Sequence, residues 1–183
     1  MIIGLSGYAQ SGKDTVAKVL VEKYGYRRVA FADPIRDLLY GMDPLVPKGY
    51  GESVINYRLQ DLVDAYGWEK VKVDYPEVRR LLQDVGVEAR RLFGDTFWIY
   101  QALSDVAPQD KVVVSDVRFE NEAQWIQEFG GQIWRIKRIG TAAVNNHVSE
   151  SEMDGYKVDQ IFVNNGTVND LEMLVRTRMQ SYQ

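Results

Sequence analysis

With 183 residues, 45% of them hydrophobic, the chain is long enough for one compact domain with a sizeable core. Its net charge of −4 argues against a nucleic-acid polymer as a partner. No apolar run approaches the roughly 18 residues that cross a membrane, so we expect no membrane span, no leader peptide and a cytoplasmic protein. The absence of cysteine excludes a disulfide framework and a thiolate zinc site, and a single histidine, His147, excludes a multi-histidine metal site.

The first predicted elements frame a phosphate-binding loop. Residues 2–6 form an apolar run that predicts a strand, and the pattern from Asp14 onward predicts an amphipathic helix. Between them, residues 7–13 read Gly-Tyr-Ala-Gln-Ser-Gly-Lys, which in this strand–loop–helix context is a P-loop. Its glycines let backbone N–H groups converge on an anion, and Lys13 supplies a positive charge for the β- and γ-phosphates of a nucleotide. The residues expected to hold the nucleotide here are Gly7, Ala9, Gln10, Ser11, Gly12, Lys13, Asp14 and Thr15.

The residue after the P-loop lysine departs from the usual Ser or Thr, whose hydroxyl binds Mg²⁺. Here it is Asp14, followed by Thr15. Because a carboxylate is a good oxygen ligand for Mg²⁺, Asp14 is the first candidate for the metal and Thr15 is the reserve candidate. The alternative is that Asp14 serves mainly as an early-helix carboxylate that favours the helix dipole.

Strand patterns and helix patterns alternate along the rest of the chain, which predicts a parallel sheet with crossover helices. The expected strands are residues 2–6, 28–31, 111–115, 132–137 and 160–163. The expected helices are residues 14–24, 35–40, 59–66, 76–93, 96–106, 119–129 and 168–179. The sequence thus predicts an α/β fold of the P-loop NTPase class, with three α/β/α layers around a five-stranded parallel sheet.

Several segment boundaries carry local signals. Pro34 opens a helix for which Asp33 is the expected N-cap. Residues 41–56 contain three Pro or Gly clusters and are expected to form a mobile loop. Gly67 is expected to end the helix before it, and residues 140–155 are polar and irregular.

A carboxylate ends one of the buried strands. Asp116 directly follows the apolar run 112–114 and Ser115, and ligands gather at the C-terminal ends of parallel strands. In a P-loop fold this is the place of the acidic partner of Mg²⁺. The alternative is an aspartate that caps the next helix. Arg118, two residues later, can face the same crevice.

Further arginines stand near the ends of predicted loops, namely Arg36, Arg90, Arg91 and Arg138. Phosphoryl transfer depends on positioning and on charge neutralisation, and the planar guanidinium donates two hydrogen bonds at once to a phosphate. For each arginine the alternative is a solvated surface residue. Trp98 and Phe97 are candidates to sandwich a base, with core packing as the alternative for at least one of them.

Residues 164–167, Asn-Asn-Gly-Thr, follow the last predicted strand and precede the last helix. Such a loop can present backbone amides to a purine ring. The alternative is a simple turn with Thr167 as the N-cap. His147 is a candidate for a substrate or lid contact, although a lone loop histidine is more often structural or exposed.

With these pieces assembled, the chain resembles the phage-type deoxynucleoside monophosphate kinases of the P-loop kinase superfamily. The matching stretches lie in order over nearly the whole chain, at residues 4–17, 31–36, 82–90, 116–122, 147–150 and 164–167. The Gly-Lys-Asp-Thr form of the P-loop and the Asp-Val-Arg-Phe stretch are its most specific parts. The departure at Asp14 therefore looks like a family trait.

The resemblance implies transfer of the γ-phosphoryl group of ATP to a deoxynucleoside 5′-monophosphate, with Mg²⁺ bridging the β- and γ-phosphates. It also implies one P-loop kinase domain in three parts: a core (1–32, 108–138 and 156–183), a helical monophosphate-binding region (33–107) and a lid (138–155). The implied partners are small-molecule nucleotides, and a homodimer is compatible with this kind of kinase.

The resemblance also gives the candidate residues separate roles. The residues expected at the transferring phosphate are Lys13, Arg118, Arg138 and Asp116. The residues expected at the acceptor are Asp33, Arg36, Arg90 and Trp98. The residues expected beside the adenine of ATP are Asn165 and Gly166. The residues expected around Mg²⁺ are Asp14, Thr15 and Asp116. No general base is assigned, because the acceptor is already a phosphate oxyanion.

Two other functions remain open from the sequence. A kinase of the same fold could act on dephospho-coenzyme A or on phosphomevalonate. A non-catalytic nucleotide switch is the alternative from another class, but a GTP switch would be expected to carry an Asn-Lys-x-Asp motif, which this sequence lacks.

Overall fold

The computed structural model describes residues 1–49, 54–141 and 152–182. The chain divides into two compact units. The core unit comprises Met1–Phe31 and Ala102–Gln183, and the helical unit comprises Ala32–Gln101. None of the described helices is both long and apolar enough to cross a lipid bilayer.

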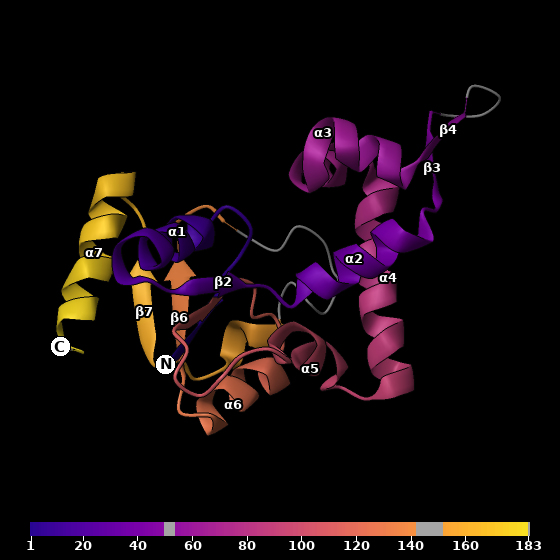
Figure 1. Cartoon of the computed structure of the whole chain (residues 1–183). Coiled ribbons are helices and arrows are strands. Elements are labelled where there is room, and N and C mark those ends of the chain that lie inside the picture. Colours follow the sequence, from indigo (N-terminus) through magenta and orange to yellow (C-terminus); the bar gives the residue numbers. More distant parts are fainter. Residues whose placement is uncertain (50–53, 142–151, 183) are drawn as a thin grey trace. The chain divides into compact units, whose positions relative to one another are not determined.

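A five-stranded parallel sheet forms the centre of the core unit (Figure 1). Its strands are β1 (Ile2–Ser6), β2 (Arg27–Val29), β5 (Val112–Val114), β6 (Gln132–Lys137) and β7 (Gln160–Val163). They follow the order β2-β5-β1-β6-β7, and each neighbouring pair is parallel. The predicted strands and their parallel arrangement are therefore confirmed, and β1, which leads into the P-loop, is the central strand.

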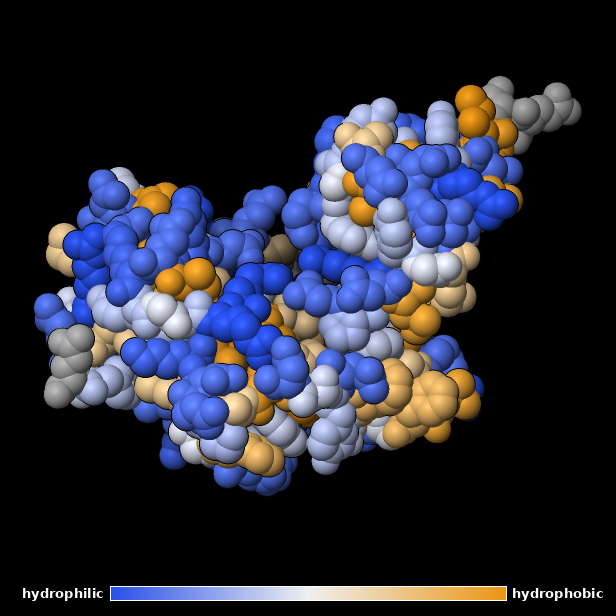
Figure 2. Space-filling model, viewed as in Figure 1, coloured by the Kyte–Doolittle hydropathy of each residue, from blue (hydrophilic) through white to orange (hydrophobic). Residues whose placement is uncertain are grey.

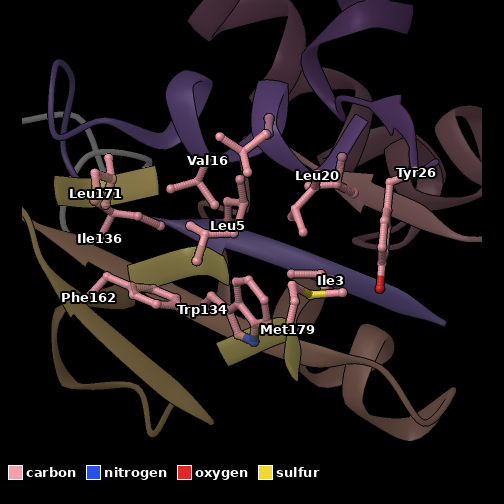
Figure 3. Packing of buried hydrophobic residues seen from close by; sticks show 14 residues of the cluster. Ile3, Leu5, Val16, Leu20, Tyr26, Trp134, Ile136, Phe162, Leu171 and Met179 are labelled. Carbon is pink, nitrogen blue, oxygen red and sulfur yellow. The ribbon is translucent and has the colours of Figure 1, made fainter. Parts of the chain in front are cut away.

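Helices cover both faces of this sheet. They are α1 (Lys13–Tyr24), α6 (Glu120–Glu128), α7 (Val168–Gln180) and the short 3-10 helix η3 (Glu152–Gly155). Successive residues of β1 point to opposite faces. Ile3 and Leu5 are buried with residues of α1 and α7 in one apolar cluster (Figure 3). At Gly4 an added Cβ would instead lie 2.9 Å from Ile126 of α6, so the predicted three-layer arrangement is confirmed.

Strand β6 is buried more completely than its sequence suggests. Alternating apolar and polar residues are typical of a strand with one solvated face, but Ile133, Trp134, Arg135 and Ile136 are all buried. The reason is that both faces of β6 are covered: Trp134 and Ile136 pack in the cluster formed with α1 and α7, and Ile133 lies with Ile126 of α6 beside Gly4 on the opposite face. A guanidinium group therefore lies in the interior at Arg135, where it needs buried acceptors.

The helical unit has a hydrophobic core of its own. Its elements are α2 (Ala32–Met42), β3 (Leu45–Lys48), β4 (Ile55–Arg58), α3 (Leu59–Asp74), α4 (Pro76–Phe93) and the start of α5 (Phe97–Leu103). The buried cluster consists of Leu39, Val46, Leu59, Leu62, Val71, Tyr75 and Val78. Apolar side chains also reach the surface where α4 ends, at Leu92 and Phe93 (Figure 2).

The mobile loop expected over residues 41–56 is wrong, because β3 and β4 pair there as an antiparallel ribbon. Val46 is fully buried in the core of the helical unit, which anchors the ribbon. The prediction failed because a two-stranded ribbon leaves each strand with an unpaired edge, where Pro47 is tolerated. Residues 50–53 lie outside the described part of the chain.

Two predicted helix boundaries are also wrong. Helix α2 begins at Ala32, so Asp33 lies in its first turn and is not the N-cap. Gly67 adopts φ 74° and ψ 156° and interrupts α3, but the helix resumes after it and ends at Asp74. Sequence analysis missed the second half of α3 because an isolated glycine signals either an end or an interruption.

Other helix boundaries are confirmed. Helix α4 has a proline in its first turn and ends before Gly94, as predicted. Thr167 is the N-cap of α7, where its side chain accepts a hydrogen bond from the N–H of Asp170. This reciprocal cap fixes the loop that precedes α7.

Candidate active site

The P-loop joins β1 to α1, and its backbone follows a path that excludes side chains at two positions. Gly7 and Gly12 adopt φ values of 136° and 111°. An added Cβ at Gly7 would lie 2.3 Å from the backbone oxygen of Ile136, and one at Gly12 would lie 2.6 Å from Nδ2 of Asn164. Only glycine combines these dihedral angles with so little space.

Positive charge and helix N–H groups converge in this loop. Lys13 Nζ donates to the backbone oxygens of Gly7 at 2.7 Å and Tyr8 at 2.8 Å. The N-cap of α1 is Gly12, which offers no side-chain acceptor to the N–H groups of the first turn. Ser11 Oγ is buried, and no hydrogen-bond partner for it occurs within the described residues. These features fit a phosphate group, which would accept from the helix N–H groups and pair with the ammonium.

A first cavity of about 370 Å³ opens beside the loop. Lys13 lines it from the P-loop, Arg118 from the segment after β5 and Arg138 from the segment after β6. Its other lining residues are Gly7, Tyr8, Ala9, Val117, Arg135, Ile136, Lys137, Thr141, Met153 and Asp154. The structure thus brings three of the four residues predicted at the transferring phosphate to one cavity. Such a group of cations suits a polyphosphate.

A second cavity of about 430 Å³ is also lined by residues of the P-loop. It is lined by Gln10, Gly12, Asp14, Thr15, Arg138, Asn164, Gly166, Thr167, Val168 and Leu171. The structure therefore brings the loop after β7 to the start of α1, which are far apart in sequence. Arg138 lines both cavities and so links them.

Asp116 forms a hydrogen bond to the backbone at Phe31, the last residue of the first segment (Met1–Phe31) of the core unit. Its Oδ1 accepts a hydrogen bond from the N–H of Phe31 at 2.8 Å. Within the described residues there is no group of three or more histidine or carboxylate side chains that could hold a metal. Asp14 and Thr15 line the second cavity. Any cation at this site would therefore depend on phosphate oxygens for much of its coordination.

The segment that carries Arg118 has a fixed backbone. Glu122 is buried, and its carboxylate accepts from the N–H groups of Arg118 at 2.8 Å and Phe119 at 3.1 Å. The N–H of Val117 donates to the backbone oxygen of Leu5 at 3.0 Å. Glu122 lies in the first turn of α6, and its carboxylate also orients the segment of Arg118.

Arg135, which lines the first cavity, is a candidate functional residue that sequence analysis missed. It donates to the backbone oxygens of Met153, of Asp154 at 3.2 Å and of Tyr156 at 3.1 Å, and burial lowers its pKa. These bonds hold η3, where Asp154 accepts a 2.6 Å hydrogen bond from the hydroxyl of Tyr8. That bond raises the pKa of Tyr8. The signal that could have identified Arg135 is a single positively charged residue within the apolar run of residues 133–136.

The predicted acceptor residues lie in the helical unit. Arg36 donates to Asp33 at 3.3 Å and to Glu69 at 3.1 Å, and Glu69 was not foreseen from the sequence. The Arg90 side chain is only 14% exposed, and its Nε lies 3.9 Å from Asp95 Oδ1. These two guanidinium groups are therefore much less solvated than that of an ordinary surface arginine.

Trp98 is a buried residue of the helical unit. It is 5% exposed, and its indole N–H donates to the backbone oxygen of Gly86 at 2.9 Å. Its ring contacts Phe97 edge to face, with centroids 4.8 Å apart. The structure thus favours the core alternative for Trp98, while Phe97 is half-buried.

Some of the sequence expectations fall outside the described residues. Residues 142–151 of the expected lid, which include His147, lie outside the described residues. Arg138 and Asp154 stand in the described residues that flank this segment. The backbone oxygen of Arg138 accepts from the N–H and the hydroxyl of Thr141, at 3.3 Å and 2.7 Å.

Comparisons with known proteins agree on a family. A sequence model described as deoxynucleotide monophosphate kinase matches residues 42–175, a range that begins after the P-loop. A protein of Acanthamoeba polyphaga mimivirus, provisionally named a deoxynucleotide monophosphate kinase, is 31% identical over 193 residues, covering 93% of this chain and 91% of the viral protein. The deoxynucleoside-5′-monophosphate kinase of Escherichia phage T5 is 26% identical over 181 residues, covering 70% of this chain and 72% of its own.

A solved structure shares the fold. Shikimate kinase from Aquifex aeolicus superposes with a TM-score of 0.51 at 14% identity, covering 100% of this chain and 98% of that one. At this identity the likeness concerns the α/β kinase fold alone. Because the family model matches more than half of the chain and the mimivirus protein matches nearly all of it, the chain belongs to the deoxynucleotide monophosphate kinase family and is a kinase.

Proposed function

We propose that this kinase transfers the γ-phosphoryl group of ATP to deoxynucleoside 5′-monophosphates, giving the diphosphate and ADP. The observation that carries the proposal is the convergence of Lys13, Arg118 and Arg138 on one cavity beside the P-loop. The family supplies the class of acceptor, and the phage T5 relative is named for the same acceptors.

The donor nucleotide would extend through both cavities. The N–H groups of the P-loop and of the α1 start would hold its phosphates, with the Lys13 ammonium on the β- and γ-phosphates. The second cavity would take the nucleoside, with Asn165 and Gly166 beside the adenine. Arg138 lines both cavities, so it can contact the phosphate chain where the two meet.

The transfer step needs charge neutralisation more than proton transfer. An oxygen of the acceptor phosphate forms a bond to the γ-phosphorus, while the bond from that phosphorus to the β–γ bridging oxygen breaks and ADP leaves. Arg118 and Arg138 would neutralise the oxygens of the transferring group, and Lys13 the leaving oxygen. The acceptor phosphate, with a second pKa of about 6, is already ionised at neutral pH, so no general base is required.

Asp14, Thr15 and Asp116 would supply oxygen donors for Mg²⁺. Mg²⁺ usually binds through one or two carboxylates together with substrate phosphates and water. This matches a site in which the described residues offer no cluster of three acidic side chains. When bound, the cation would neutralise negative charge between the β- and γ-phosphates.

Arg36 and Arg90 would hold the acceptor phosphate, with Asp33 as a further contact. Both guanidinium groups face carboxylates in the structure, at Glu69 and at Asp95. A phosphate is a stronger bidentate partner for arginine and would compete for these donors. Because both substrates are nucleotides of the cell interior, we also propose a cytoplasmic site of action. The homodimer and the lid stay predictions.

Coupled ADP release with each of the four deoxynucleoside and four ribonucleoside monophosphates tests the proposal, with dephospho-coenzyme A and phosphomevalonate as rival acceptors. We expect turnover with at least one deoxynucleoside monophosphate to exceed that with the rival acceptors by a wide margin. Turnover confined to a rival acceptor would refute the proposed substrate class. ATP consumption without any acceptor dependence would refute the transfer reaction.

The change Arg90→Ala is expected to raise the KM for the acceptor by about 10-fold or more, because a charge-assisted hydrogen bond is worth roughly 1.5–3 kcal/mol. The Kd for ATP should change little. Steady-state kinetics and calorimetric titration with ATP measure the two effects. Arg91→Ala is the matched control, since Arg91 is exposed and pairs with Glu88 at 2.7 Å. Loss of ATP affinity with an unchanged acceptor KM would exchange the proposed places of the two substrates.

The change Trp98→Phe is expected to lower the free energy of unfolding by about 1–3 kcal/mol, because the Gly86 carbonyl loses its donor in the interior. The acceptor KM should stay within twofold of the original, since the ring lies in the core. Thermal unfolding and steady-state kinetics give both values. A large rise in the acceptor KM at unchanged stability would restore the stacking role for Trp98.

A further inference from the structure

Asn164 is a buried polar residue to which the proposed reaction gives no role. It is 7% exposed and directly follows β7. Its Nδ2 donates to the backbone oxygen of Ser11 in the P-loop at 2.8 Å, across 153 positions of sequence. Its own N–H donates to the backbone oxygen of Lys137 at 2.7 Å. One side chain therefore connects the end of the sheet to the phosphate-binding loop.

This hydrogen bond fixes the orientation of one P-loop peptide. A peptide unit is planar and trans, so its C=O and its N–H point in opposite directions. When the Ser11 C=O is turned toward Asn164, the Gly12 N–H must point away from it. Gly12 leaves no room for a side chain beside the same carboxamide, since an added Cβ would lie 2.6 Å from Nδ2. The amide of Asn164 thus decides which way the Gly12 N–H is presented.

The loop that carries Asn164 is itself held firmly. Asn165 Oδ1 accepts from the N–H of Ile139 at 3.1 Å. The Asp170 carboxylate accepts from the N–H and the hydroxyl of Thr167, both at 2.7 Å. These contacts join the loop to the segment after β6 and to α7. Asn164 therefore acts from a rigid base, which a positioning role requires.

We propose that Asn164 is a positioning residue that keeps the P-loop in its phosphate-binding form. Its amide donor orients the Ser11–Gly12 peptide. The loop between β7 and α7 thereby connects the part of the donor site proposed for the nucleoside with the loop that binds the phosphates. The inference rests on the proposed function only in assigning ATP to the P-loop. Its effect is on binding, which can be measured without turnover.

The test is calorimetric titration of Asn164→Asp and Asn164→Ala with ATP and with tripolyphosphate. Aspartate keeps the shape but replaces the donor by an acceptor that faces the Ser11 carbonyl, and alanine removes the donor without this repulsion. We expect both ligands to bind about 10- to 100-fold more weakly, the cost of an unsatisfied buried group. Tripolyphosphate has no base, so an equal loss of affinity for both ligands would show that the defect lies in binding of the phosphates. Weakened ATP binding with unchanged tripolyphosphate binding would overturn the proposal.

A matched control separates positioning from stability. Val175 of α7 is fully buried in the apolar cluster that contains Ile3 and Leu5, and it contributes no polar group. Val175→Ala should lower the melting temperature yet leave the ATP Kd within twofold at a temperature where every variant is folded. An equal loss of ATP affinity in this control, or wild-type affinity in Asn164→Ala, would refute the positioning role. Should the wild-type enzyme not phosphorylate deoxynucleoside monophosphates, the proposed function would fail while the binding result would still decide the role of Asn164.

Discussion

Replacing Lys13 by alanine is expected to lower kcat for phosphoryl transfer by about 100- to 1,000-fold or more, the usual loss when one preorganised donor to a developing charge is removed. Lys13 Nζ lies in the loop between the backbone oxygens of Gly7 and Tyr8 and lines the first cavity. Its ammonium is the group that can neutralise the negative charge that develops on the leaving oxygen. Both backbone oxygens can turn to water in the variant, so we expect the melting temperature to change little. Coupled ADP release and thermal unfolding measure the two quantities.

Lys18→Ala is the control for this experiment. Lys18 lies on the same helix, with 71% of its side chain exposed and its Nζ 3.8 Å from Glu22. Such a surface pair contributes little to stability, at most about 1 kcal/mol. We expect full activity from this variant. Substantial turnover in Lys13→Ala at matched folding would mean that the P-loop is not the donor site.

The change Arg118→Ala is expected to lower kcat by about 1,000- to 100,000-fold, the range known for arginines that neutralise a transferring phosphoryl group. The Kd for ATP should stay within a few-fold, because Arg118 acts on charge that develops during transfer. The backbone of its segment is held by Glu122, so removing the side chain should leave the segment in place. Rapid-quench measurement of a single turnover isolates this step from product release.

Two further variants sharpen the interpretation. Arg118→Lys should recover only part of the rate, because lysine keeps the charge but loses the two parallel hydrogen bonds of the guanidinium. Arg176→Ala should behave as the wild type, since Arg176 is a half-exposed residue of α7 whose guanidinium lies 3.7 Å from Glu172. If Arg118→Ala instead lost ATP affinity at unchanged kcat, Arg118 would bind the donor in its ground state and would not stabilise the transfer.

The elements around the P-loop were predictable because their signals are local. The apolar run of β1, the glycines at positions 7 and 12 and the amphipathic start of α1 occupy one continuous stretch of sequence. The short apolar run of β5 likewise predicts a buried parallel strand. Arg118 and Arg138 could be placed near the site from their positions after strands, since ligands collect at the C-terminal ends of such strands.

The contacts that support the site could not be read in the same way. Asn164 and Ser11 are 153 positions apart, and their hydrogen bond exists only because β7 and β1 end on the same edge of one sheet. The role of Arg135 depends on the burial of β6 on both faces, which depends on the helices packed on the two sides of the sheet. The ribbon of β3 and β4 was missed because its turn signals outweighed its short strands, whose pairing depends on Val46 entering the core of the helical unit.

The separate hydrophobic cores have a practical consequence for spectroscopy. The four tryptophans are divided evenly between the two units, with Trp68 and Trp98 in the helical unit and Trp125 and Trp134 in the core unit. Trp134 is fully buried and lies 5.2 Å from the ring of Phe162, so its emission should report the integrity of the sheet. Intrinsic fluorescence of this enzyme is therefore a sum of two local signals. Replacing the two tryptophans of one unit by phenylalanine would leave a fluorescence signal that reports on the other unit alone.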